Sequence, residues 1–422
     1  MTKGRVYFYK VGRAVRPTLF NRLLTILLIG ICIFGCTQNR NAAAKYVFYF
    51  IGDGMGLSHV SLTEVYLASQ EGRIGSNSLS FTQFPVFGLA TTHSVSNIIT
   101  ESSAAGTALA TGEKTNNNML GTRPDSTNLR SLAYPIHEAG FAVGITTNVT
   151  IDHATPASFY ANSPSRSDYY RIAQQLPQTG FAFFGGGGFI QPTGRNGDLP
   201  SVYESIADSG YTVARGVGSY QLKKEGAKKM FYTQDPGIED DLPYAIDRRQ
   251  GDLSLSMVVE AAIDFLYDPK GKGFFLMSEG GKIDWSAHSN DAKTTIMEVL
   301  DFSDAVSLAV AFYEKHPHET LIVVTADHET GGLSLGATSG YTMYLDALAD
   351  QTCSLDADPG SLQALRQINQ NARIGWTTNA HTGAMVPVFA IGAGSSTFGG
   401  KMDNTDIPKK ICAAMGVTFT QE

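Results

Sequence analysis

Carboxylate and imidazole side chains follow several apolar segments of this chain, at positions where they could bind metal ions. They lie after strand-like runs or in glycine-rich loops, and they are Asp53, Glu279, Asp284, His288, Asp327, His328 and His381. Asp284 and His288 are four residues apart, so they would lie on one face of a helical turn. Imidazole and carboxylate without thiolate suit catalytic zinc, whereas oxygen ligands alone suit magnesium. A single Asp-His pair is more often structural, but the whole set favours a metal site.

A serine-rich segment, residues 100–112 (TESSAAGTALATG), could supply a nucleophile. It predicts a helix over 102–110 that opens with hydroxyl residues, and such residues commonly act as N-caps. A nucleophilic serine must lose its proton, yet the chain has no Gly-x-Ser-x-Gly elbow of the serine hydrolases. A zinc ion could lower the hydroxyl pKa instead, and a helix N-terminus would favour a nearby phosphate.

The segments before these side chains predict the sheet that positions them. Uninterrupted apolar runs indicate strands buried on both faces, as in a parallel sheet; they cover residues 46–54, 141–148, 273–281, 321–332 and 386–394. Apolar residues at helical spacing predict helices at 253–267 and 294–313, and a last helix capped by residues 404–406 is expected to end near 415. Strands alternating with helices predict an α/β fold, a mostly parallel central sheet with helices on both faces. Ligands bind beyond the carboxyl ends of such strands.

Gly185–Gly188 follow the run FAFF and predict a loop after an edge strand, because the Lys-Ser/Thr of a phosphate-binding P-loop is missing. We expect one catalytic domain at 45–422, with a small insert at about 334–380 that forms a rim over the site. Cys353 and Cys412 could pair, but two isolated cysteines do not establish a disulfide.

The N-terminus predicts export. Residues 1–22 carry six basic and no acidic residues, and an apolar run of 13 follows at 23–35. That run is too short to span a bilayer and is typical of a signal peptide. Residues 33–36 (IFGC) resemble a bacterial lipoprotein signal, although an uncleaved anchor or a plain signal fits as well. We expect a signal peptide at 1–36 and a tether at 37–44. Thr37 after Cys36 favours a lipid anchor in the outer membrane, with the enzyme in the periplasm or at the cell surface.

The net charge of the chain bears on the kinds of partner that it could bind. Without residues 1–35 the formal net charge falls from −7 to −13. Nucleic acid is not expected as a specific partner, because its binding usually needs a basic face.

Seven motifs in order carry a resemblance to the alkaline phosphatase family. They span Phe50 to Gly383, and they are FIGDGMG at 50–56, TESSAAGTALATG at 100–112, HATPASFY at 153–160, SR at 165–166, SEGGKIDWSAH at 278–288, TADHETGG at 325–332 and HTG at 381–383. The resemblance implies hydrolysis of phosphate monoesters to an alcohol and inorganic phosphate. It also implies a homodimer.

The resemblance assigns each residue a role. It implies a first zinc site at Asp284, His288 and His381, a second at Asp53, Asp327 and His328, and a magnesium site at Asp53, Thr155 and Glu279. Ser102 would form a phosphoserine, and Arg166 would bind two phosphate oxygens, which suits a guanidinium. Three divalent cations exceed the charge of the four carboxylates, so the site would attract a phosphate dianion.

Four positions depart from the usual pattern. Glu101 replaces an aspartate beside the nucleophile, so its contact with Arg166 could differ. Ser103 stands where alanine is usual, and counting back from Gly112 favours Ser102. His153 and Trp285 replace an aspartate and a lysine; we expect His153 beside the magnesium site and Trp285 to pack at the rim.

Two other functions remain open. A phosphodiesterase or sulfatase of the same superfamily is one; the sulfatase motif Cys/Ser-x-Pro-x-Arg is missing, and a diesterase would be expected to lack the Arg166 and magnesium positions. The other is an inactive surface protein that binds metal or phosphate.

Overall fold

The computed structural model describes residues 43–235 and 240–421. The predicted signal peptide and all but the end of the tether therefore lie outside the described residues. Among the described helices, none combines the length and the apolar character needed to cross a membrane.

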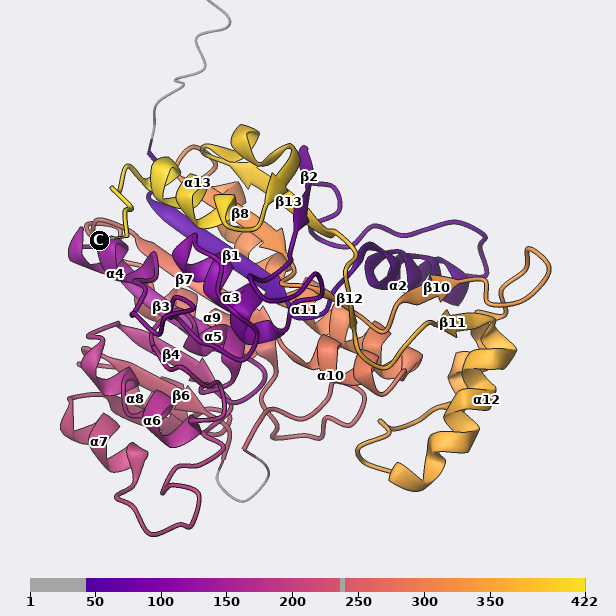
Figure 1. The fold of residues 1–422 in the computed structure, drawn as a ribbon, viewed down its shortest axis with the longest axis horizontal. Helices are drawn as coiled ribbons and strands as arrows, with labels where there is room; N and C mark the ends of the chain where they lie inside the picture. Colours follow the sequence, from indigo (N-terminus) through magenta and orange to yellow (C-terminus); the bar gives the residue numbers. More distant parts are fainter. Residues whose placement is uncertain (1–42, 236–239, 422) are drawn as a thin grey trace, which may run out of the picture. The chain divides into compact units, whose positions relative to one another are not determined.

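A ten-stranded sheet runs through the described residues (Figure 1). Its strands lie in the order β14 (Gly400–Asp403), β2 (Val86–Thr91), β13 (Val386–Gly392), β8 (Thr320–Thr325), β1 (Tyr46–Gly52), β7 (Phe274–Gly280), β3 (Ala142–Thr147), β4 (Phe183–Gly186), β6 (Met230–Thr233) and β5 (Thr212–Arg215). Strand β13 is antiparallel to β2 and β8, and the other neighbours are parallel. The predicted mostly parallel sheet is confirmed.

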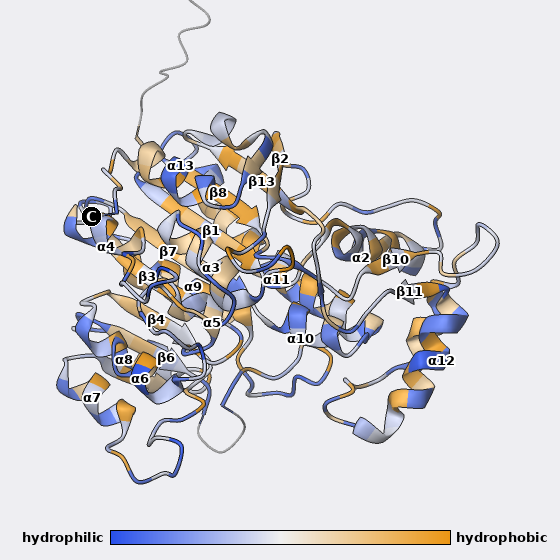
Figure 2. Ribbon diagram, in the orientation of Figure 1, coloured by the Kyte–Doolittle hydropathy of each residue, from blue (hydrophilic) through white to orange (hydrophobic). Residues whose placement is uncertain are grey.

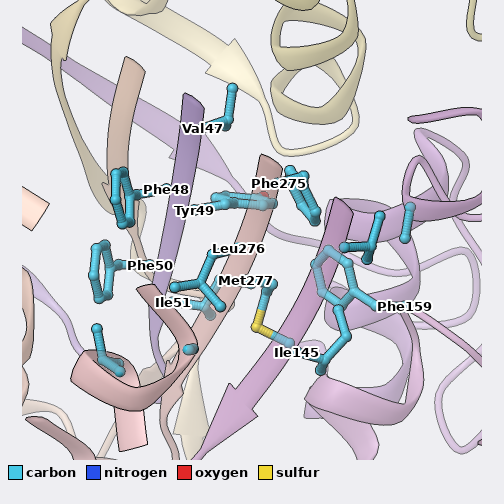
Figure 3. Close-up of a cluster of buried hydrophobic side chains, with 14 of the residues drawn as sticks. Val47, Phe48, Tyr49, Phe50, Ile51, Ile145, Phe159, Phe275, Leu276 and Met277 are labelled. Carbon is cyan, nitrogen blue, oxygen red and sulfur yellow. The ribbon is translucent and has the colours of Figure 1, made fainter. Parts of the chain in front are cut away.

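The central strands are buried on both faces because their sequences are apolar throughout. All seven residues of β1 are buried, and so are all seven of β7. Side chains of β1 alternate between the faces of the sheet: Phe48 and Phe50 point to one side and Tyr49 to the other (Figure 3). Phe50 meets Phe302 edge-on at 5.9 Å between ring centroids, and Tyr49 meets Phe159 at 5.9 Å.

Helices cover both faces, as predicted. They are α2 (Leu57–Gln70), α3 (Ser102–Thr111), α4 (Ala133–Glu138), α5 (Ala154–Ala157), α6 (Tyr169–Ala173), α7 (Val202–Asp208), α8 (Ser219–Lys223), α9 (Leu255–Leu266), α10 (Lys282–His288), α11 (Ala292–Lys315), α12 (Leu362–Ala372) and α13 (Asp406–Met415). Helices α9 and α11 pack on the face of Phe48 and Phe50, and α3 and α5 lie on the face of Tyr49. Figure 2 shows the hydrophobic strands between helices with hydrophilic outer surfaces.

The segment predicted as an insert has its own small core. Strand β10 (Leu333–Leu335) pairs with β11 (Ile374–Trp376), and α12 precedes β11. Leu345, Leu348 and Ile374 pack together against residues of α2 and α11. A second ribbon pairs β9 (Glu329–Thr330) with β12 (His381–Thr382) and brackets the insert. The role of the insert as a rim over the site stays a prediction.

The structure corrects the prediction for Gly185–Gly188. The strand before this loop, β4, lies inside the sheet between β3 and β6, and Gly185 and Gly186 belong to it. The error arose because β5 and β6 have only four residues each and gave no recognisable pattern. Cys353 and Cys412 are both free in the described structure.

Candidate active site

The carboxyl ends of β1, β7 and β8 bring the predicted ligands together. In the sheet register, Ile51 of β1 lies beside Glu279 of β7 and Thr325 of β8. Asp53 and Asp327 follow their strands by one and two residues, and both are fully buried, as is Glu279. Helix α10 begins two residues after β7 and carries Asp284 and His288. Parallel strands therefore deliver these side chains to one edge of the sheet.

The first cluster joins Asp284, His288 and His381, the predicted first zinc ligands. The Nε2 atom of His288 lies 3.3 Å from Asp284 Oδ2 and 3.0 Å from His381 Nε2. Both imidazoles donate their Nδ1 hydrogens to backbone carbonyls, His288 to Asn379 at 2.7 Å and His381 to Thr100 at 2.9 Å. These bonds leave the Nε2 lone pairs free to bind a metal ion.

The second cluster surrounds His328. Its Nε2 atom lies 3.3 Å from each of three oxygens, namely Asp53 Oδ1, Asp327 Oδ2 and Ser102 Oγ. The other Asp327 oxygen accepts hydrogen bonds from the amides of Gly54 and His328, which fix the carboxylate. Asp53 Oδ1 and Asp327 Oδ2 are buried and make no hydrogen bond. The structure thus brings together the predicted second zinc ligands and the predicted nucleophile.

The third cluster contains Asp53, Glu279 and His153, with one ligand atom of each within 4.8 Å of the others. Thr155 Oγ1 lies 3.4 Å from Asp53 Oδ2. Thr147 donates its hydroxyl hydrogen to one oxygen of Glu279, and the other, Oε1, is buried without a hydrogen bond. These positions are the predicted magnesium ligands, with His153 beside them as expected.

Burial makes these clusters electrostatically costly without cations. It raises the pKa values of Asp53 and Asp327 well above their usual range, and that of Glu279 to about 7. Burial also lowers the pKa of His328 well below its usual value. The imidazole therefore does not supply a compensating positive charge. Unpartnered carboxylate oxygens beside the neutral imidazole of His328 fit a divalent cation.

The Ser102 hydroxyl, the predicted nucleophile, does not cap its helix, because another residue does so. Ser102 is the first residue of α3, and Glu101 before it is the N-cap. The Glu101 carboxylate accepts hydrogen bonds from the amides of Ser103 and Ala104 at 3.0 and 2.8 Å. The expectation that a hydroxyl residue caps this helix was wrong, because the longer carboxylate reaches both amides. The Ser102 hydroxyl consequently faces His328.

Arg166 lies between the two residues predicted to assist the site. Its Nη1 donates to Glu101 Oε2 at 2.6 Å, and its Nη2 donates to His153 Nε2 at 3.2 Å. Burial and the Arg166 charge lower the pKa of His153 to about 3, so its ring is neutral and can accept this bond. Trp285 packs edge-on against His153 at 5.7 Å between ring centroids. Glu101 therefore does contact Arg166.

Some supporting groups were not predicted. The Thr330 hydroxyl donates to Asp284 Oδ1 and lies 3.2 Å from His328 Nδ1, so it links the first two clusters. Thr330 stands inside the motif at 325–332, and that motif was the available signal. The carbonyls of Thr100 and Asn379 carry no signal, because every residue type has one.

Comparison with known proteins gives the family. The sequence model of the family described as alkaline phosphatase matches residues 44–182 and 237–417. The chain belongs to the alkaline phosphatase family. It is 32% identical to alkaline phosphatase 4 of Bacillus subtilis over 423 residues, which cover 87% of this chain and 88% of that protein. The predicted resemblance is confirmed, and with it, at the level of the family, a phosphoric monoester hydrolase.

Solved structures of alkaline phosphatases agree with this family assignment. The alkaline phosphatase of the Antarctic bacterium TAB5 is 31% identical, with a TM-score of 0.73 over 89% of this chain and 99% of its own. A variant of that enzyme was solved with Mg bound in its M3 site. The Thermus thermophilus alkaline phosphatase is 27% identical, with a TM-score of 0.78 over 91% of this chain and 93% of its own. The fold is that of the family.

Thr330→Val should weaken zinc binding by about 10- to 100-fold, because Asp284 and His328 lose the hydroxyl that orients them. The measurement is competition for zinc with a chromophoric chelator. The control is Thr342→Val, at an exposed threonine of the insert. Unchanged zinc affinity in Thr330→Val would show that this hydroxyl does not support the clusters.

Proposed function

We propose that this chain hydrolyses phosphate monoesters through a phosphoserine on Ser102. The observation that carries the proposal is the position of the Ser102 hydroxyl. It is the first side chain of α3, it is not used as a cap, and it lies 3.3 Å from His328 Nε2. A helix N-terminus favours the phosphate dianion at that point.

We propose two zinc ions and one magnesium ion per chain. The first and second clusters, with imidazole and carboxylate ligands, would hold zinc; Asp53, Thr155 and Glu279, with oxygen ligands, would hold magnesium. A variant of the related TAB5 enzyme, with glutamate in place of a histidine, was solved with Mg in its M3 site, which supports a magnesium site in enzymes of this family. Bound divalent cations would supply positive charge that lowers the pKa of hydroxyl groups and offsets the charge of the phosphate.

The side chains of the protein position the reacting groups. Arg166, held by Glu101 and His153, would bind two phosphate oxygens with its guanidinium nitrogens. The Ser102 oxygen, having lost its proton, attacks phosphorus, and the bond from phosphorus to the alcohol oxygen breaks in line. The released alkoxide takes a proton from water. A water molecule then attacks the phosphoserine, restores the serine hydroxyl and releases inorganic phosphate.

Arg166, the proposed magnesium ligands and Ser102 also argue against a phosphodiesterase and against an inactive binding protein. Arg166 and the magnesium ligands favour a monoesterase over a diesterase, since a monoester offers more free oxygens to bind. An inactive binding protein would not need a nucleophile, yet the Ser102 hydroxyl stays available beside His328.

A trapping experiment tests the proposal. Metal-loaded protein mixed with phenyl phosphate and quenched in acid should carry one phosphate on Ser102, located by mass spectrometry. Ser102→Ala should lose the label and at least 10³-fold in kcat, since the nucleophilic route is removed. Ser103→Ala should keep the label on Ser102. Label on another residue, or faster hydrolysis of a phosphate diester than of the monoester, would contradict the proposal.

We propose that Cys36 carries a lipid that anchors the enzyme to the outer membrane, facing the periplasm or the outside. The basic and apolar pattern of residues 1–36 supports this. Cells fed a labelled fatty acid should incorporate the label, and Cys36→Ser should abolish it. Incorporation that is equal in both proteins would refute the anchor.

We propose a homodimer whose interface covers exposed apolar side chains that are close in sequence to Thr100 and His381. Val95, Ile98, Ile99 and Met385 are exposed, Ile98 by 84%, and exposed apolar groups that gather together commonly mark interfaces. Ile98→Asp should shift the mass measured by light scattering from two chains to one. The exposed Leu222→Asp, far along the chain, is the control. A monomeric unmodified protein would exclude the dimer.

A further inference from the structure

A pocket of about 720 Å³ borders the first cluster, between the end of α10 and the insert. Its wall includes His288 and Asn290 on one side, and on the other Arg366, Asn369 and Gln370 from α12 with Trp376 from β11. Figure 1 shows α12 and β11 on the same side of the sheet as the end of α10. The volume lies within the range of small-molecule sites.

Two polar groups of this wall are buried and lack partners. Asn369 is only 6% exposed; its amide nitrogen donates to the carbonyl of Asn290 at 2.7 Å, while its Oδ1 accepts nothing. The indole Nε1 of Trp376 is likewise buried without a partner. Asn369 therefore ties α12 to the end of α10, and the polar side chains of α12 that a ligand in the pocket can reach are Arg366 and Gln370, which are exposed.

The spatial order of the three site histidines indicates where the alcohol portion of the substrate would lie. His328, beside Ser102, stacks on His381 at 3.6 Å between ring centroids, and His381 lies next to His288. The exposed fraction of these side chains rises in the same order, from 0% to 12% to 39%. In an in-line displacement the leaving alcohol lies opposite the attacking oxygen. It would therefore point away from Ser102, past His381 toward His288.

The pocket wall indicates which alcohols fit. Amide and hydroxyl side chains make up eight of the fifteen described residues of this wall; the others are one guanidinium, one indole, one imidazole and four apolar side chains, and none is a carboxylate. Without a carboxylate the pocket does not suit an amine or a cation. Amides bind hydroxyl groups both as donors and as acceptors. We propose, on the basis of the proposed function, that this pocket binds the hydroxyl-rich alcohol portion of sugar phosphates, and that Arg366 and Gln370 determine this specificity.

The test compares two substrates on the metal-loaded enzyme, glucose 6-phosphate and phenyl phosphate. Arg366→Ala should lower kcat/KM for glucose 6-phosphate about tenfold, the loss expected for a hydrogen bond from a charged donor. It should change kcat/KM for phenyl phosphate by less than about twofold. Gln370→Ala should act in the same direction. Gln363→Ala, at an exposed position of α12 outside the pocket, is the control and should change neither value.

The outcomes separate the two proposals. Suppose that the unmodified enzyme hydrolyses phenyl phosphate, but Arg366→Ala lowers kcat/KM equally for both substrates or for neither. The proposed sugar specificity of the pocket is then wrong, and the proposed function stands. If the unmodified enzyme hydrolyses neither substrate, both fail. Binding gives a second readout: glucose 6-phosphate should bind Ser102→Ala protein more weakly after the added Arg366→Ala change, measured by calorimetry. Equal binding would also overturn the pocket.

Discussion

The burial of three carboxyl groups at the carboxyl ends of parallel strands is the constraint on which the rest of the site depends. Asp53, Glu279 and Asp327 are fully buried, and each leaves one carboxylate oxygen without a hydrogen bond. Burying such groups costs free energy unless cations or donors compensate them. The protein supplies few donors and keeps His328 neutral. Divalent cations bound by these carboxylates would remove this cost and keep the groups ionised at neutral pH.

The surrounding structure fixes the positions of the predicted ligands. Strand register places Ile51, two residues before Asp53, beside Glu279, and one helical turn of α10 fixes Asp284 against His288. Backbone carbonyls orient the imidazoles of the first cluster. The ribbon of β9 and β12 connects the first and second clusters. His381 belongs to β12, and Thr330 of β9 contacts both Asp284 and His328. Orientation by such supporting groups is what gives a metal site its affinity.

Much of this arrangement could be predicted from the sequence, since long apolar runs and side-chain motifs are local signals. Strands β1, β7 and β8 and the ligands after them follow from such runs. Strand β2 could not be predicted in this way, because only two of its six residues, Gly88 and Ala90, are buried, and both are small. The Glu101 cap was missed because serine is also a good N-cap, and the choice between them depends on the reach of a side chain in three dimensions. The pocket of the insert arises from contacts between α12, β11 and α10, which no single segment encodes.

Zinc titration of metal-free protein in the presence of magnesium is the measurement that tests this account most directly. Calorimetry should show two zinc ions bound per chain. The thermal unfolding midpoint should rise with zinc concentration, because cations that bind only the folded state stabilise it. No saturable zinc binding, or binding that leaves the unfolding midpoint unchanged, would contradict the claim that the buried carboxylates form a metal site.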